Sequence, residues 1–203
     1  VLDLDVDFYA FSAHKMLGPT GVGVLYGKNE LLDAMPPFLG GGEMIGEVHL
    51  DHFTWKDPPL KFEAGTPNFA DVVAFGAAID YLADLGMDRI RQHEIAITTY
   101  ALDEISRLGD GITVFGPRDP TVRGGVVSFA MDGIHPHDIA QVMDWDAICI
   151  RAGHHCAQPL MHHLQVPATA RASFYLYNTE QEVDIFVNNL KKVGEYFGNG
   201  PRS

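Results

Sequence analysis

Apolar and polar residues alternate roughly over the first eleven positions, a pattern that predicts a half-buried strand running into a loop. A short apolar run at residues 22–26 predicts a second strand, which Gly27 ends. Residues 30–35 are expected to form a short helix that stops at two prolines. The stretch 43–69 mixes charges with prolines and predicts extended chain without a repeat.

Helical spacing begins at about residue 70 and predicts two long helices. Over residues 70–85, apolar positions four residues apart indicate the buried face of the first helix. These positions are Val73, Ala77, Tyr81 and Leu85, with Ala74, Ala78 and Leu82 beside them. Gly86 is expected to end this helix, and the second one is expected over residues 87–108.

The remainder of the chain predicts a small mixed sheet with helices. Strands are expected at residues 112–115, 125–130, 147–151 and 171–177. Helices are expected to begin near His135 and after Cys156. Thr179, followed three residues later by Glu182, predicts a capping box for a terminal helix to about residue 197. The tail, residues 198–203, is predicted to be disordered.

The order of these elements indicates two domains of unequal completeness. Long paired helices followed by a small mixed sheet suggest that a second domain begins near Gly86, so that residues 86–203 form a complete small α+β domain. Residues 1–85 contain too few strands for a complete α/β domain. Since the chain also begins at Val1 without a methionine or a targeting segment, we expect it to be a piece of a longer polypeptide.

Composition narrows the class of protein. Of 203 residues, 46% are hydrophobic and 20% charged, as in globular proteins, and no apolar stretch approaches the ~18 residues of a membrane helix. Fourteen basic residues against 27 acidic ones give a net charge of −13, so nucleic acid and anionic membranes are not expected as partners. Two cysteines cannot form a disulfide framework, and we expect a cytoplasmic protein.

The first candidate for chemistry is Lys15, which follows Ser12 and His14 at the end of the first predicted strand. A lysine binds an aldehyde cofactor as a Schiff base when its amine is neutral. A hydroxyl and an imidazole beside it are able to hold a phosphate. Spacing alone also allows a surface lysine in a turn, because His-Lys is a weak signal.

The second candidate is Cys156, in the run Arg-Ala-Gly-His-His-Cys-Ala-Gln-Pro at residues 151–159. Glycine, imidazoles and an arginine around a cysteine favour the thiolate, the reactive form. One alternative is a buried thiol, the role expected for Cys149 inside its apolar run. The other is a metal site, although the spacing matches no known zinc finger. Its ligands would come from His154, His155, Cys156, His162 and His163.

Two further residues are candidates for binding anions. Thr66 lies just before the helix at residues 70–85, where a hydroxyl and free amides suit a phosphate, although an ordinary capped turn fits this motif better when it is taken alone. Arg171 opens a predicted strand, and a guanidinium there is able to grip a carboxylate or to pair with an acid. The Walker, GxGxxG, HExxH and GxSxG motifs are absent.

Taken together, these segments resemble the class II (Suf-type) cysteine desulfurases, pyridoxal-phosphate-dependent enzymes of fold type I. The matching runs lie in the family's order, cover nearly the whole chain and correspond to about the C-terminal half of a family member. They are DFYAFSAHKMLGPTGVGVLYGK (7–28), MPPFLGGGEMI (35–45), KFEAGTPN (61–68), IRAGHHCAQPLM (150–161) and RASFYLYNT (171–179). The resemblance implies an α/β fold in which residues 1–85 end the large cofactor-binding domain and residues 86–203 form the small domain.

The resemblance also implies roles for individual residues. Lys15 would form the Schiff base with pyridoxal 5'-phosphate and then remove the α-proton of the substrate, with Ser12 and His14 on the cofactor phosphate. Cys156 would take the sulfur of L-cysteine as a persulfide and release alanine. Arg171 would hold the substrate carboxylate, with Arg151 nearby. Ala13 departs from the family, which has glycine at this place, and its methyl group requires a negative φ.

The resemblance further implies partners. The threonine matching Thr66 reaches the phosphate of a second subunit, so a homodimer is expected. The sulfur would pass to an acceptor protein of the Suf system for iron–sulfur cluster assembly. Two alternatives remain at this point, a selenocysteine lyase on the same site and a catalytically incomplete fragment that only dimerises or binds partners.

Overall fold

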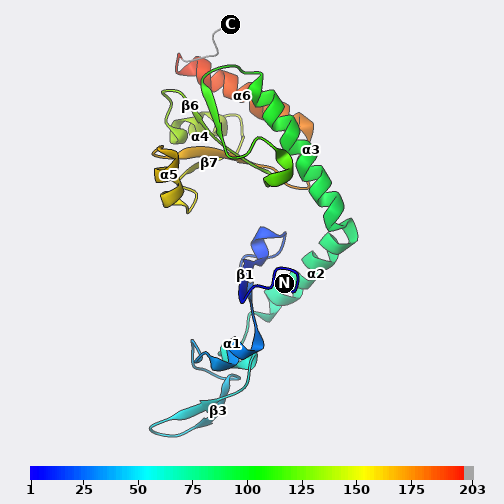
Figure 1. Ribbon diagram of the computed structural model, residues 1–203, viewed down its shortest axis with the longest axis vertical. Helices are drawn as coiled ribbons and strands as arrows, with labels where there is room; N and C mark the ends of the chain where they lie inside the picture. The colour runs from blue at the N-terminus through cyan, green and yellow to red at the C-terminus, as the bar shows by residue number, and fades with distance from the viewer. Residues whose placement is uncertain (199–203) are drawn as a thin grey trace. The chain divides into compact units, whose positions relative to one another are not determined.

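The computed structural model describes residues 1–198, so most of the tail predicted to be disordered lies outside the described residues. The chain divides into two compact units, Val1–Gly86 and Met87–Ser203 (Figure 1). Each unit has its own secondary structure and its own buried residues, and each is described separately below.

The first unit consists of two antiparallel strand pairs, two 3-10 turns and two α-helices. The strand pairs are β1 (Phe8–Ser12) with β2 (Gly23–Gly27) and β3 (Ile45–Val48) with β4 (Phe53–Trp55). The helices are the 3-10 turns η1 (Ala13–Lys15) and η2 (Leu60–Phe62), the short α1 (Asn29–Ala34) and the long α2 (Phe69–Leu85). The hairpin of β3 and β4 lies in the stretch predicted to be extended chain without a repeat.

The α2 helix is confirmed, but of the face predicted to be buried only the flanking positions Ala78 and Leu82 are buried. Phe75, Ala78 and Leu82 are the buried side chains, whereas Val73 and Tyr81 are exposed. Phe75 and Ala78 pack with Ala13 in the small apolar cluster of this unit. Because apolar residues surround nearly the whole of this helix, periodicity did not single out one face.

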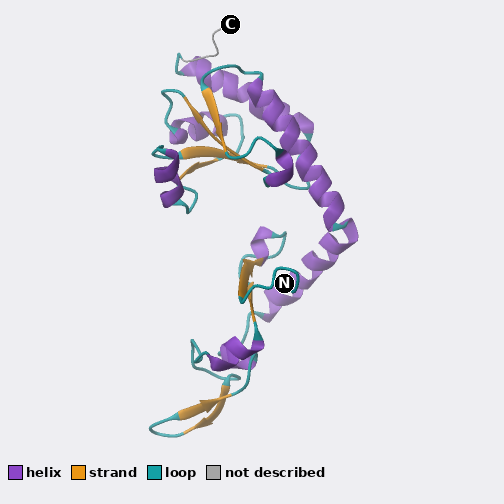
Figure 2. Cartoon of the chain, in the orientation of Figure 1, coloured by secondary structure: helices purple, strands orange, loops and turns teal. Residues whose placement is uncertain are grey.

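The second unit is a four-stranded antiparallel sheet with helices (Figure 2). The strand order is β5 (Ile112–Phe115), β6 (Val126–Met131), β8 (Thr169–Ser173) and β7 (Arg151–Gly153). The helices are α3 (Met87–Ser106), α4 (Pro136–Asp144), α5 (Gln158–Leu164), α6 (Glu180–Tyr196) and the 3-10 turn η3 (Pro120–Val122). The predicted bounds of β5 are confirmed, as is the capping box at Thr179.

One face of this sheet carries the core. Alternate residues of β6 and β8, such as Val127, Phe129 and Ala170, are buried with side chains of α3, α4 and α6. Because successive side chains of a strand point to opposite faces, Arg171 lies on the face of β8 opposite this core.

The strand predicted at residues 147–151 is displaced toward the C-terminus. Ala147 takes a positive φ of 58° after α4, and pairing with β8 begins only at Arg151. Residues 148–150 are therefore outside the sheet. The interpretation of Cys149 as a buried thiol is wrong, because its side chain is exposed.

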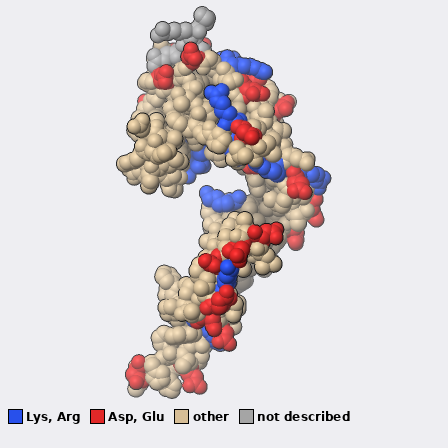
Figure 3. All heavy atoms as spheres, in the orientation of Figure 1, with Lys and Arg blue, Asp and Glu red and all other residues tan. Residues whose placement is uncertain are grey.

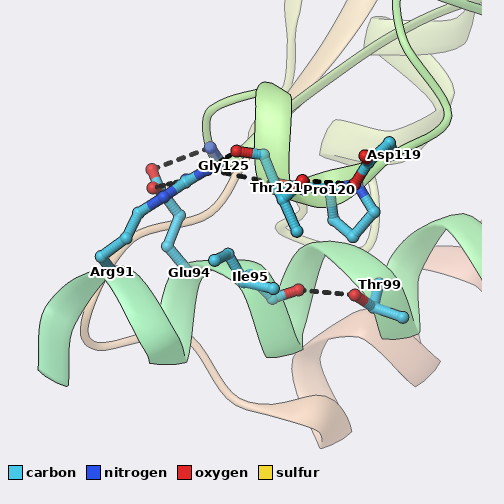
Figure 4. A network of polar contacts seen from close by, with 8 residues as sticks. All are labelled: Arg91, Glu94, Ile95, Thr99, Asp119, Pro120, Thr121 and Gly125. Carbon is cyan, nitrogen blue, oxygen red and sulfur yellow. Dashed lines mark hydrogen bonds and ion pairs between the residues drawn. The ribbon is translucent and has the colours of Figure 1, made fainter. Parts of the chain in front are cut away.

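A polar network ties α3 to the segment that leads into β6 (Figure 4). Arg91 donates to the carbonyls of Pro120 and Thr121 and pairs with Glu94. The Glu94 carboxylate accepts from the Gly125 N–H at 2.8 Å. Gly125 in turn accepts a hydrogen bond from the Phe174 N–H at 2.6 Å, just after β8. The network thus fixes the position at which β6 and β8 begin to pair.

We expect Gly125→Ala to destabilise the second unit. A Cβ atom there would lie 2.4 Å from the Phe174 carbonyl oxygen, which is backbone and has no free rotation. The free energy of unfolding should fall by about 1–3 kcal/mol, the usual cost of overpacking. Gly124→Ala is the matched control, because its nearest neighbour would be the Glu94 carboxylate at 3.8 Å. Equal urea midpoints for the two variants would contradict this reading.

The surface agrees with the acidic balance of the sequence. On the face drawn in Figure 3, acidic side chains gather around the N-terminal turn of the first unit, where Lys28 pairs with Asp5 and Asp7. None of the helices in residues 1–198 combines the length and the apolar character needed to cross a membrane.

Candidate active site

Lys15 lies in a turn that Ala13 anchors to the first unit. The Ala13 carbonyl accepts hydrogen bonds from Met16 and Gly18, and its N–H donates to Val22. The Ala13 methyl group is fully buried beside Phe75. Ala13 does not take a positive φ, so the departure from glycine at this place is accommodated. The buried alanine thereby fixes the turn that presents the residues on either side of it.

The side chains around this anchor are available for a ligand. His14 and Lys15 are exposed, and Ser12 is half-buried. Within residues 1–198, Lys15 has no acid partner, although the chain has 27 acids. By contrast, Lys28 and Lys56 both form ion pairs in the same unit. The structure thus leaves the amine of Lys15, the Ser12 hydroxyl and the His14 imidazole available, and their role at a phosphorylated aldehyde stays a prediction.

Thr66 is exposed in the loop before α2. Asn68 caps this helix by accepting from the Asp71 N–H, and its amide donates to the Gly21 carbonyl at 3.2 Å. The cap confirms that the helix start itself is an ordinary capped turn. The bond to Gly21 links the Thr66 loop to the segment that follows Lys15, so both predicted cofactor-binding segments belong to one local structure.

In the second unit, Arg151 and Arg171 lie directly opposite each other in the β7–β8 pair. Directly opposed residues of antiparallel strands have Cβ atoms about 5 Å apart on one face, and like charges there are destabilising. No acid pairs with either arginine among the described residues, and the buried Nε of Arg171 has no hydrogen-bond partner there. An anion between the two guanidinium groups would relieve both deficits.

Cys156 joins this pair of arginines. The Arg151 Nη2 donates to the Cys156 Sγ at 3.3 Å, and the cysteine is exposed. A hydrogen bond of this kind is strongest when the sulfur is ionised. The arrangement therefore places the cysteine sulfur beside two arginines that come from neighbouring strands.

His155 is the residue whose role was not foreseen from the sequence. Its Nε2 lies 2.8 Å from the Thr169 hydroxyl and 3.0 Å from the Thr169 carbonyl oxygen. Burial, with a smaller contribution from Arg171 and Arg151, holds the pKa of His155 below its usual value. The signal in the sequence that could have indicated this contact is Thr169, a polar residue beside the buried Ala168 and Ala170. No group of three or more His, Cys, Asp or Glu side chains within residues 1–198 has the arrangement of a metal site.

The chain matches a family model and is similar in sequence to curated proteins. The family model described as aminotransferase class V matches residues 1–186. A probable cysteine desulfurase of Halalkalibacterium halodurans is 55% identical over 199 residues, which are 98% of this chain and 48% of the relative. The chain thus spans about half the length of the curated relatives it matches.

Solved structures give the same picture. The Escherichia coli cysteine desulfurase CsdA, in its S-sulfonic acid form, superposes with a TM-score of 0.90 at 44% identity, over 97% of this chain and 48% of that one. The apo cysteine desulfurase of Thermococcus onnurineus NA1 gives 0.91 at 40% identity, over 97% and 49%. These matches confirm the α/β fold class and the family resemblance expected from the sequence.

Proposed function

The chain belongs to the aminotransferase class V family, and from this premise we propose that the protein containing it is a pyridoxal-phosphate-dependent cysteine desulfurase. The observation that carries the proposal is the sulfur of Cys156 beside Arg151, with Arg171 opposite on the same sheet face. The names of the relatives, which are cysteine desulfurases, support the same activity.

The residues of the first unit fit the cofactor, which the family match supports. Lys15 would hold its aldehyde carbon and Ser12 and His14 its phosphate, because these side chains have no other partner among the described residues. Bound pyridoxal phosphate supplies an electron sink for charge developing at the substrate Cα. Lys15, once its amine is free, is the base for the Cα proton. We propose that residues 1–85 end the large cofactor-binding domain and residues 86–203 form the small one.

The residues of the second unit fit the substrate and its sulfur. Arg171 binds the carboxylate of L-cysteine, with Arg151 as its neighbour. The Cys156 thiolate attacks the substrate sulfur, so an S–S bond forms as the Cβ–S bond breaks. The electron pair of the broken bond and a proton go to Cβ, and alanine leaves. The balance is one thiol and one cysteine giving one persulfide and one alanine, with no external oxidant.

We further propose a sulfur acceptor and a homodimeric state for this enzyme. The sulfur passes from Cys156 to an acceptor protein of the Suf system for iron–sulfur cluster assembly, and the enzyme is a cytoplasmic homodimer in which Thr66 contributes to the phosphate site of the partner subunit. The exposed positions of Cys156 and Thr66 support these roles.

The experiment adds pyridoxal phosphate to the purified protein and measures its visible absorption, the effect of borohydride, and alanine formed from L-cysteine. A band that borohydride removes, together with alanine, is the expected result. Rates on L-cysteine, L-selenocysteine and L-cysteine sulfinate, measured side by side, decide the substrate. A protein that binds no cofactor and dimerises would instead support the reading as a partner-binding fragment.

Arg171→Met should raise KM for L-cysteine about 100-fold, because one charged hydrogen-bond pair to the carboxylate is lost. Arg171→Lys keeps the charge without the paired donors and should recover only part of the affinity. Arg118→Met, at an exposed arginine of the same unit, serves as the control. An unchanged KM in Arg171→Met would exclude this residue from substrate binding.

A further inference from the structure

The cysteine loop has a backbone that its own sequence does not favour. His155 and Cys156 take φ values of 56° and 60°, two consecutive left-handed residues, and neither is glycine. Such a conformation persists only where the surrounding structure imposes it. A contact outside residues 155 and 156 must therefore hold this loop.

The side chain of His155 makes that contact. Its Nε2 lies within hydrogen-bond distance of both the carbonyl and the hydroxyl of Thr169, which is fully buried in β8. A carbonyl oxygen only accepts, so the Nε2 carries the hydrogen and donates. Thr169 lies opposite Gly153 in the β7–β8 pair. Along β8, Thr169 is two residues before Arg171, and along β7, Gly153 is two residues after Arg151. The imidazole thus ties the loop to the strand that carries Arg171.

We propose that His155 is a positioning residue, whose bond to Thr169 keeps the Cys156 sulfur on the Arg151 guanidinium. The inference rests on the proposed function, because the sulfur so positioned is the one that attacks the substrate. Among the described residues, His155 forms no hydrogen bond with the Cys156 sulfur or with either arginine, so it acts through the loop backbone.

The electrostatics favour a positioning role over proton transfer. With Nε2–H directed at Thr169, the remaining nitrogen, Nδ1, is buried and has no partner among the described residues. Protonating it would bury a second N–H donor without an acceptor, close to two arginines. The pKa of His155 is accordingly held low, first by burial and then by those charges. The imidazole is neutral at neutral pH, so it holds the loop without supplying a proton.

The test measures alkylation of Cys156 by iodoacetamide, followed on its tryptic peptide in the intact protein. His155→Ala should slow alkylation at pH 7 by on the order of tenfold, because the freed loop no longer holds the sulfur on the Arg151 guanidinium. His155→Gln, whose amide reaches the Thr169 carbonyl as Nε2 does, should restore most of the rate. His163→Ala, at an exposed histidine of α5, should leave it unchanged.

A second arm separates positioning from general destabilisation. If the bond acts through the Arg151 contact, His155→Ala should slow alkylation little or not at all in an Arg151→Met background. That background also carries Cys149→Ala, because without Arg151 one tryptic peptide would contain both cysteines. Thr169→Val, which removes only the hydroxyl, should give a smaller slowing, and it keeps the test decisive if His155→Ala fails to fold. Additive effects of the histidine and arginine changes, or no slowing in either single variant, would overturn the proposal.

Turnover provides the last readout. If His155 positions the Cys156 sulfur, His155→Ala should lower kcat for alanine formation. It should leave KM for L-cysteine unchanged, since Arg171 is still present. A rise in KM with constant kcat would contradict it. Because alkylation requires neither cofactor nor L-cysteine, slowed alkylation without any desulfuration in the wild type would reject the proposed function and leave the positioning role standing.

Discussion

Lys15→Ala should abolish the visible absorption band of the cofactor-loaded protein and reduce alanine formation from L-cysteine to background. The proposed roles of this side chain are to bind the cofactor aldehyde and to act as base at the substrate Cα. The turn at residues 12–18 contains no second lysine to replace it. Removing a positioned base alone costs on the order of 100-fold or more. Absorption spectra and borohydride treatment measure the first role, and an alanine assay measures the second.

The matched control for this experiment is Lys28→Ala. Lys28 belongs to the same unit but pairs with Asp5 and Asp7, so its loss should leave the band unchanged. Lys15→Arg keeps a cation in the turn without a neutral amine, and it should behave as Lys15→Ala does. A wild-type spectrum in Lys15→Ala would refute the assignment of this lysine.

Cys156→Ala should retain the absorption band of the cofactor and lose alanine production by on the order of 100-fold or more, because the proposed acceptor of the substrate sulfur is removed. The separation follows from the fold, since Cys156 and the Lys15 turn belong to different units of the chain. The two measurements, spectrum and alanine, therefore move independently in this variant and together in Lys15→Ala.

Cys149 provides an internal control for that result. It is the other cysteine of the chain and is exposed as Cys156 is. It lies between α4 and β7 and has no hydrogen bond to an arginine within residues 1–198. Cys149→Ala should keep both the spectrum and the turnover. Full desulfuration by Cys156→Ala would mean that a different acceptor takes the sulfur.

Local signals predicted most of the helices well. The capping box of Thr179 and Glu182 is present with both of its hydrogen bonds, and Gly86 ends α2 as expected. These features depend on a few neighbouring residues, so a single sequence contains all the information that they require. The long apolar periodicity of α3 is another case, with Ile97, Ala101 and Ile105 buried on one face.

Features that depend on pairing between distant segments were missed. The β7 strand starts at Arg151 because its partner is β8, some twenty positions away, whereas the apolar run before it predicted an earlier start. The β3–β4 hairpin closes through His49–His52, a turn without the glycine that usually indicates one. The register of strands is a tertiary property, which composition and spacing do not determine.

The candidate site shows the same division. Individual residues such as Cys156 and Arg171 stand out in the sequence by type and by family resemblance. Their arrangement, with two arginines opposed across a strand pair and His155 bound to Thr169, follows only from the register of β7 and β8. The sequence therefore proposes which groups carry the chemistry, and the structure adds how those of the second unit are arranged.

The most direct test of the central claim is the mass of the tryptic peptide that contains Cys156, taken after the cofactor-loaded protein reacts with L-cysteine in the absence of a sulfur acceptor. The account predicts a gain of one sulfur atom on this peptide, reversed by a reducing agent, with one alanine formed for each modified chain. Alanine formed in that amount while the Cys156 peptide keeps its original mass, with the sulfur found as free sulfide or on Cys149, would contradict it.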